Sequence, residues 1–194
     1  MDSKIKEILE KIDKLQKSLQ KEQIRLSKKY GFFIQQKKVI FLEKIKKRNR
    51  TFRIPAWKYL LPKNIRHFLS IPFIYSMIIP ALVLDIFITI YHHTTFPLYG
   101  IPKVKRSDFI IYDRRFLDYL NVIQKIHCLY CSYLNGLLAY SMEIAGRTER
   151  YWCPIKSSYN KNVFTHNWYR DFADYGDPED WKNKFNDHEV FEKK

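Results

Sequence analysis

A run without any basic residue, from Phe68 to Tyr91, constrains the fold more than any other feature of this 194-residue chain. It reads FLSIPFIYSMIIPALVLDIFITIY, and Asp85 is its one acidic residue. About 20 consecutive apolar residues are enough for a helix to cross a bilayer. Pro72 and Pro80 each remove a backbone donor, however, and Asp85 is costly in hydrocarbon. We therefore expect a membrane-inserted segment with a proline kink.

Basic residues on both sides of this run argue against a simple single pass, which is basic on its cytoplasmic side only. In one topology the segment bends at Pro80 and stays on the cytoplasmic face, re-entrant or in the membrane plane. In another it spans, and residues 126–145 cross back. His127, Asn135 and Glu143 make that second stretch a poor lipid-facing helix, which favours the first topology. The remaining alternative is a buried core helix of a soluble domain.

The first 36 residues predict a helical arm. Apolar residues recur three and four positions apart, in the a/d rhythm of a coiled coil, with Lys and Glu around them. Such a helix either docks on its own chain or pairs with a second copy or a partner protein. The expected seam consists of Ile5, Ile8, Ile12, Leu15 and Leu19.

The formal net charge of +15 is concentrated near the N-terminus. Residues 1–66 hold 20 Lys and Arg against 6 Asp and Glu, whereas residues 171–194 hold 8 acids against 4 bases. A basic arm attracts polyanions, either phosphate backbones or an anionic membrane leaflet. Residues 37–67 add Phe41, Phe52, Trp57 and Tyr59, a mixture that suits a membrane interface or single-stranded nucleic acid. We favour membrane lipids as the partner because the apolar run follows directly.

The three cysteines form the one candidate metal-binding or redox site in the sequence. Cys128 and Cys131 lie one helical turn apart, so both sulfurs can reach one ion, and Cys153 is the obvious third ligand. An unbroken helix from residue 131 to residue 153 would separate these thiols by about 33 Å, so a shared ion requires the chain to fold back after Gly146. The candidates for a fourth ligand are His127, His92, His93 and His166.

Three interpretations of the cysteines stay open: a zinc ion or an iron–sulfur cluster, inert thiols, or a redox dithiol. The residues before Cys128 favour a helix, and this removes the helix N-terminus that activates thioredoxin-like thiols. No nucleotide-binding, dinucleotide-binding or common hydrolase motif is present in the sequence. The first residues have no secretory-signal pattern, and an odd cysteine count favours a reducing compartment. We expect a non-catalytic protein.

Several blocks in fixed order resemble a family of uncharacterised bacterial membrane-associated proteins. The blocks are FPxYGIPKVxR, CxYCxYxNG and RTExYWCPIK, within residues 82–178. The resemblance implies the cytoplasmic face of a bacterial inner membrane and a family setting for the three cysteines. In that family a His often follows WCPIK, whereas Ser157 stands here, so a Cys3His zinc site would need another histidine.

Together these patterns predict a mainly α-helical, membrane-anchored accessory or scaffold subunit that recruits a partner through its arm. The alternatives are a membrane-associated redox protein and a basic nucleic-acid-binding protein. The expected divisions are a coiled-coil arm (1–36), a basic aromatic interfacial linker (37–67), a membrane-inserted segment (68–91), a helical cysteine-containing domain (92–170) and an acidic tail (171–194).

Overall fold

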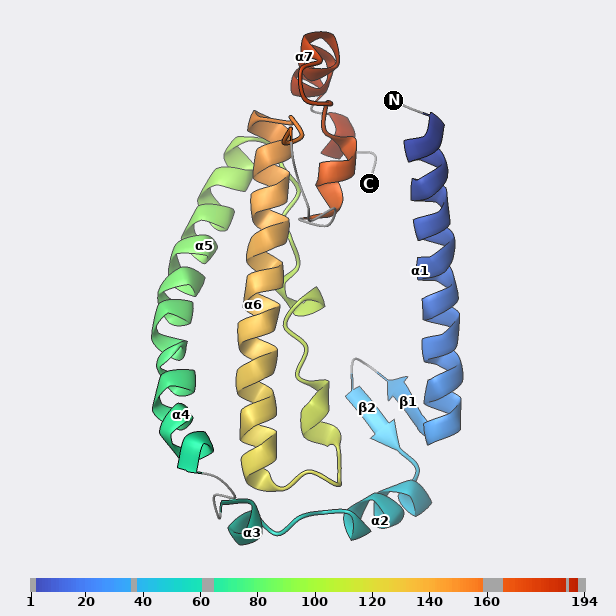
Figure 1. Cartoon of the computed structure of the whole chain (residues 1–194), viewed down its shortest axis with the longest axis vertical. Coiled ribbons are helices and arrows are strands. Elements are labelled where there is room, and N and C mark those ends of the chain that lie inside the picture. Colours follow the sequence, from blue (N-terminus) through green and yellow to red (C-terminus); the bar gives the residue numbers. More distant parts are fainter. Residues whose placement is uncertain (1–2, 36–37, 61–64, 159–165, 188, 192–194) are drawn as a thin grey trace. The chain divides into compact units, whose positions relative to one another are not determined.

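The computed structural model describes residues 3–35, 38–60, 65–158, 166–187 and 189–191, and the chain is mainly helical, as predicted (Figure 1). Contacts divide it into two compact units. The first unit comprises Met1–Leu61 and Asp113–Ile126, and the second comprises Pro62–Tyr112 and His127–Lys194. Each unit is therefore assembled from two separate stretches of sequence.

The first unit contains a long helix followed by a β-hairpin. Helix α1, Ser3–Tyr30, ends at Gly31, whose φ of 65° lies in the left-handed region that favours glycine. Strand β1 (Phe32–Gln35) then pairs antiparallel with strand β2 (Lys38–Phe41). The rings of Phe32 and Phe41 lie 5.6 Å apart, and Phe41 is buried.

The hairpin lies where the sequence predicted the end of the arm and the start of an interfacial linker. Phe41, one of the aromatic residues expected at the interface, is paired in this small sheet and buried. Phe52 and Trp57 are exposed, as an interfacial role requires, while the side chain of Tyr59 lies outside the described part. The signal for the hairpin was two short runs, FFI and VIF, around a polar QQKK.

In the rest of the first unit, a hydrogen bond from a helix-capping residue joins its two stretches of chain. Helices α2 (Glu43–Thr51) and α3 (Ala56–Leu60) follow the hairpin, and a 3₁₀ turn, η2, covers Asp113–Phe116. Asn121 and Gln124 form a reciprocal capping box at the start of helix α6, with N–H to side-chain oxygen distances of 2.9 and 3.0 Å. The buried Asn121 amide also donates to the carbonyl of Ile54, at 3.1 Å.

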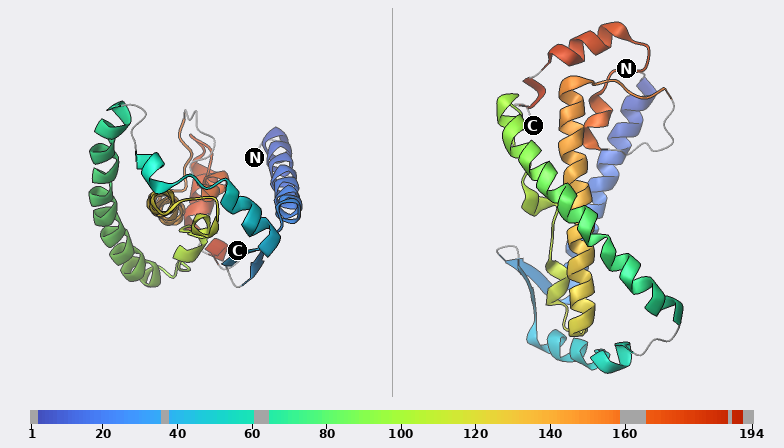
Figure 2. Two further views of the ribbon diagram at one scale, coloured as in Figure 1. Left: turned by 90° about the horizontal axis from the view of Figure 1, so that it is seen from below. Right: turned by 90° about the vertical axis from the view of Figure 1, so that its left-hand side faces the viewer.

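The second unit is built around helices α4 (Ile65–Ser76), α5 (Ile78–Leu98) and α6 (Val122–Trp152), with the short 3₁₀ turn η1 (Arg106–Asp108) between the last two. Helices α4 and α5 follow one curved path that crosses α6 (Figure 2). The predicted reversal at Pro80 is wrong. The break falls at Met77, and Pro80 lies in the first turn of α5, where a missing N–H costs little.

Helix α6 is continuous over 31 residues and passes Asn135-Gly136 without a turn. It does not stop at Gly146, after which the chain would have to fold back for the three cysteines to share an ion. A Cβ on Gly136 would lie 2.8 Å from the Ile110 Cα, and a Cβ on Gly146 would lie 2.6 Å from the His166 ring. Both glycines therefore permit close approach of another segment to the helix.

The described part of the acidic tail packs against the core of the second unit. Turn η3 (Asn167–Asp171) leads into the tail, which contains helix α7 (Pro178–Asn186) and turn η4 (Glu189–Phe191). Helix α7 begins at Asp177-Pro178, a helix-start pattern in the sequence, and the Asp177 carboxylate accepts a hydrogen bond from the Asp180 N–H at 2.9 Å. The core cluster contains Ala81, Phe96, Ile101, Val104, Ile110, Leu137, Tyr140, Ile144, Trp168, Phe172 and Phe191.

Candidate functional site

The surface of helices α4 and α5 is the most unusual feature of the second unit. Residues 69–98, which run from α4 through α5, are long and apolar enough to cross a membrane, and an 18-residue stretch of them has a mean hydropathy of 2.2. Only 6% of that stretch is buried. A core helix of a soluble protein would be mostly buried, so the buried core helix that the sequence left open does not fit this structure.

Helix α5 has two different faces. Its outer face consists of exposed apolar side chains, with Phe87 68% exposed and Ile79 65% exposed. Its inner face packs against residues 101–110 and against α6, and it carries Asp85 and His92, whereas the polar residues His93 and Thr94 are exposed. The outer face comprises Ile79, Val83, Ile86, Phe87 and Ile90; the inner face comprises Ala81, Asp85, Ile88, His92 and Phe96.

On the inner face, both carboxylate oxygens of Asp85 accept hydrogen bonds. Both guanidinium nitrogens of Arg106 donate to its two carboxylate oxygens, Nη2 at 2.6 Å. The hydroxyl of Tyr133 on α6 donates at 2.8 Å, and that of Thr89 at 3.3 Å. Hydrogen bonding to Asp85 raises the pKa of Arg106. Burial and the bond to Asp85 raise the pKa of Tyr133 to about 12, so this cluster holds a fixed ion pair and a neutral phenol at physiological pH.

His92 belongs to the same inner face and is 1% exposed. Its Nε2 accepts a hydrogen bond from the Val104 N–H at 2.9 Å. A neutral ring must then carry its proton on Nδ1, which donates to the Tyr140 hydroxyl oxygen at 3.0 Å. Both ring nitrogens of this predicted metal ligand are thus engaged by protein groups, and His92 fixes residues 101–104 against α5.

The three cysteines are free thiols on one helix and just beyond its end. Cys128 and Cys131 lie near the start of α6, and Cys153 directly follows its last residue, Trp152. Because α6 is unbroken, the rise of about 1.5 Å per residue separates Cys131 from Cys153 by about 33 Å. The structure therefore does not bring these thiols to one site.

The other predicted ligands are also dispersed. His93 bonds the Thr89 carbonyl at 2.9 Å, and the His127 ring lies 5.8 Å from that of Tyr75. His166 caps turn η3 by accepting from the Tyr169 N–H, and its Nε2 bonds Glu149 at 2.9 Å. Among the described residues, no three His, Cys, Asp or Glu side chains are grouped so that they could hold a metal ion. Zinc or iron–sulfur binding stays a prediction.

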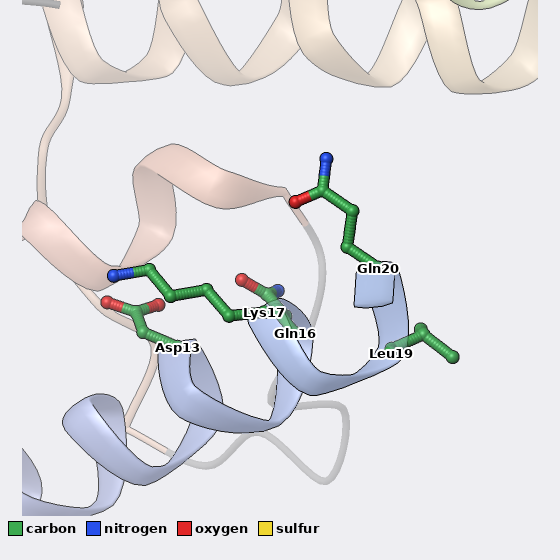
Figure 3. A pocket seen from close by; sticks show the side chains of 5 residues that line it. All are labelled: Asp13, Gln16, Lys17, Leu19 and Gln20. Carbon is green, nitrogen blue, oxygen red and sulfur yellow. The ribbon is translucent and has the colours of Figure 1, made fainter. Parts of the chain in front are cut away.

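A hollow on the first unit has no catalytic character. Its lining residues, Asp13, Gln16, Lys17, Leu19 and Gln20, all belong to helix α1 (Figure 3). An active site gathers polar groups from several elements around one point, whereas these side chains are neighbours along a single helix surface. The hollow is therefore a surface feature of the arm.

Sequence reasoning missed a clamp that holds the C-terminal segment to the end of α6. Arg150 is 1% exposed, and its Nε donates to Asp171 at 2.8 Å. Its terminal nitrogens donate to the carbonyl of Lys184 and to Asp187. Burial would raise the pKa of Asp171, but hydrogen bonds from Lys184 and Arg150 outweigh burial and lower it. The charged residues near the end of α6 were the only sequence signal for this clamp, and they do not identify its partners.

No protein-family model, curated protein or solved structure matches the chain. The fold and the exposed face define it as a mainly helical protein in whose described residues one helical segment has the length and composition of a membrane span.

Proposed function

We propose that this chain is a membrane-anchored, non-catalytic accessory protein. The outer face of α5, continued by exposed residues of α4, binds lipid, and helix α1 recruits a partner protein or a second copy. The observation that carries the anchor is that only 6% of the apolar 18-residue stretch within residues 69–98 is buried. An apolar surface of this length is costly in water, and transfer to acyl chains removes that cost.

The inner-face cluster supports the anchor by neutralising the one acid of the segment. Asp85 accepts bonds from Arg106, Tyr133 and Thr89, all on the inner side of α5. Its charge is therefore compensated by the protein itself, and the outer face remains apolar from Ile79 to Ile90. An unpaired carboxylate in this segment would oppose insertion by several kcal/mol.

Helix α1 supports recruitment because described parts of its predicted seam are exposed. Leu15 is 69% exposed and Leu19 is 61% exposed, while Ile12 is half-buried. The side chains of Ile5 and Ile8 lie outside the described part. A stripe of leucines on a 28-residue charged helix fits a partner helix that covers the same stripe.

Vesicle flotation of the full-length protein tests the anchor. We expect wild type to float with vesicles of phosphatidylglycerol and phosphatidylethanolamine, and Ile86→Asp to weaken binding by about 10- to 100-fold, because a buried Ile contributes about 1.5–3 kcal/mol. Ile24→Asp is the matched control, since Ile24 is 56% exposed on α1. A wild-type protein that stays monomeric without detergent and does not float would refute the anchor.

We place the protein on the cytoplasmic face of a bacterial inner membrane. Support comes from the basic excess near the N-terminus, which suits anionic headgroups, and from three free cysteines, which suit a reducing compartment.

A further inference from the structure

The chain beside the inner face of α5 shows how the anchor meets the bilayer. Residues 99–105 leave the C-terminal end of α5 and run back along it without regular secondary structure. The Val104 N–H bonds His92, and Arg106 then pairs with Asp85. This irregular segment therefore follows α5 from Leu98 back to Asp85.

The length over which this irregular segment lies along α5 decides whether α5 can cross the membrane or must lie in its plane. Thirteen residues separate Asp85 from Leu98, which is about 20 Å along the helix axis. The hydrocarbon core is about 30 Å thick, so its midplane lies about 15 Å from either surface. If α5 crossed the membrane, the Asp85–Arg106 pair would lie near the midplane.

Neighbouring residues make that depth untenable. Lys103 and Lys105 are exposed on either side of the buried Val104. A lipid-exposed irregular segment does not occur within hydrocarbon, and each lysine there costs about 2.5–3.5 kcal/mol even on the most lenient scale. In contrast, the opposite side of α5 presents apolar side chains as far as Ile90, with Ile86 59% and Ile90 58% exposed, and the hydroxyl of the exposed Thr94 donates to the Ile90 carbonyl at 2.8 Å.

We propose that the outer face of α5, with the exposed residues of α4, lies flat in one leaflet of the bilayer. This inference rests on the proposed membrane anchor and specifies the surface that it uses. The outer face sits among the upper acyl chains, while Lys103 and Lys105 face headgroups or water. Both flanks of the segment, at Lys58 and at Lys103, then lie on the same side of the membrane.

Exposed side chains at the end of α4 extend this surface in the direction of the helix path. Phe73 is 77% exposed, Ile74 is 50% exposed and Met77 is 56% exposed. A helix in the interface plane buries one face about 5–10 Å deep. In α5 the other face is covered by residues 101–110 and α6 of the same protein.

Counting tags on a double-cysteine variant tests the orientation. The native cysteines are replaced by serine, and Lys58→Cys and Lys103→Cys are introduced at exposed positions. The purified full chain is reconstituted in sealed vesicles of phosphatidylglycerol and phosphatidylethanolamine and treated with a membrane-impermeant polyethylene-glycol maleimide. We expect molecules with two tags or none, because both thiols share one side. One tag on every molecule would overturn the proposal.

Two further measurements keep the outcome clear. Flotation is scored first: protein that does not float refutes the anchor and the orientation together, whereas floating protein with one tag per molecule refutes the orientation alone. On wild type bound from outside, an impermeant amine reagent should modify Lys58 and Lys103 equally, as read by peptide mass spectrometry. Protection of only one of these lysines would contradict the flat arrangement without any substitution.

Discussion

Gly136 lies where helix α6 meets the backbone of the segment before it. An added Cβ would lie 2.8 Å from both the Ile110 Cα and the Phe109 carbonyl oxygen. Backbone cannot yield as a flexible side chain can, so Gly136→Ala should destabilise the protein by about 1–3 kcal/mol despite the better helix propensity of alanine. Denaturant unfolding followed by circular dichroism measures this, with the exposed neighbour Asn135→Ala as control. Equal stability of the two variants would contradict the close contact.

Arg150 is the buried charge on which the C-terminal segment depends. Arg150→Ala removes the donor that serves Asp171 and the Lys184 carbonyl. We expect a loss of about 3 kcal/mol, because breaking a buried ionic network leaves its acceptors without compensation. Lys182→Ala on the exposed side of α7 should change the free energy of unfolding by less than about 0.5 kcal/mol. Proteolysis that still spares residues 167–187 in the Arg150 variant would argue against the clamp.

The lowered pKa of Asp171 gives the clamp a pH dependence. A carboxyl whose pKa is lower in the folded state stabilises the protein above its unfolded value of about 3.9, and this stability is lost as pH falls through the folded value. Acid unfolding of wild type should therefore steepen below about pH 4, and Asp171→Asn should reduce that slope. Unfolding free energies measured between pH 3 and pH 7 would show parallel curves if Asp171 played no part.

Within the element α5, the pair of Asp85 and Arg106 matters more than either charge alone. Asp85→Ala leaves the Arg106 guanidinium beside Tyr140 without its carboxylate, and because the arginine side chain is 41% exposed, we expect a loss of about 2 kcal/mol. Adding Arg106→Leu should recover most of that loss. A double-mutant cycle of unfolding free energies measures the coupling, and strictly additive losses would show that the pair does not act as a unit.

Helix α1 can be altered without unfolding the protein, because Leu15 and Leu19 are exposed. Replacing both with glutamate should change the free energy of unfolding by less than about 1 kcal/mol and should abolish self-association through the arm. Sedimentation equilibrium over a range of concentrations measures the association. The matched control replaces Gln16 and Ser18, also exposed, with glutamate. If the control variant dissociates equally, charge rather than the leucine stripe controls association.

At the scale of the whole molecule, the +15 charge predicts sensitivity to salt and lipid composition. Lys and Arg near an anionic leaflet contribute about 1 kcal/mol each, an interaction that added salt screens. Binding to phosphatidylglycerol vesicles should weaken several-fold between 50 and 500 mM salt, and binding to neutral phosphatidylcholine vesicles should be weaker but insensitive to salt. Flotation at each salt concentration measures both. A salt-insensitive affinity for the anionic vesicles would show that the basic arm does not touch the membrane.

The sequence alone determined the helical class, the apolar segment and the start of α7, because each depends on local chemistry. Helical periodicity, a long run without Lys or Arg, and an Asp-Pro start are properties of neighbouring residues. Tertiary structure decided that α6 passes Gly136 and Gly146 unbroken, that Cys131 and Cys153 lie at opposite ends of it, and that Arg106 reaches Asp85. Those outcomes depend on which segment packs against a helix, and packing between residues far apart in the chain leaves no local pattern to read.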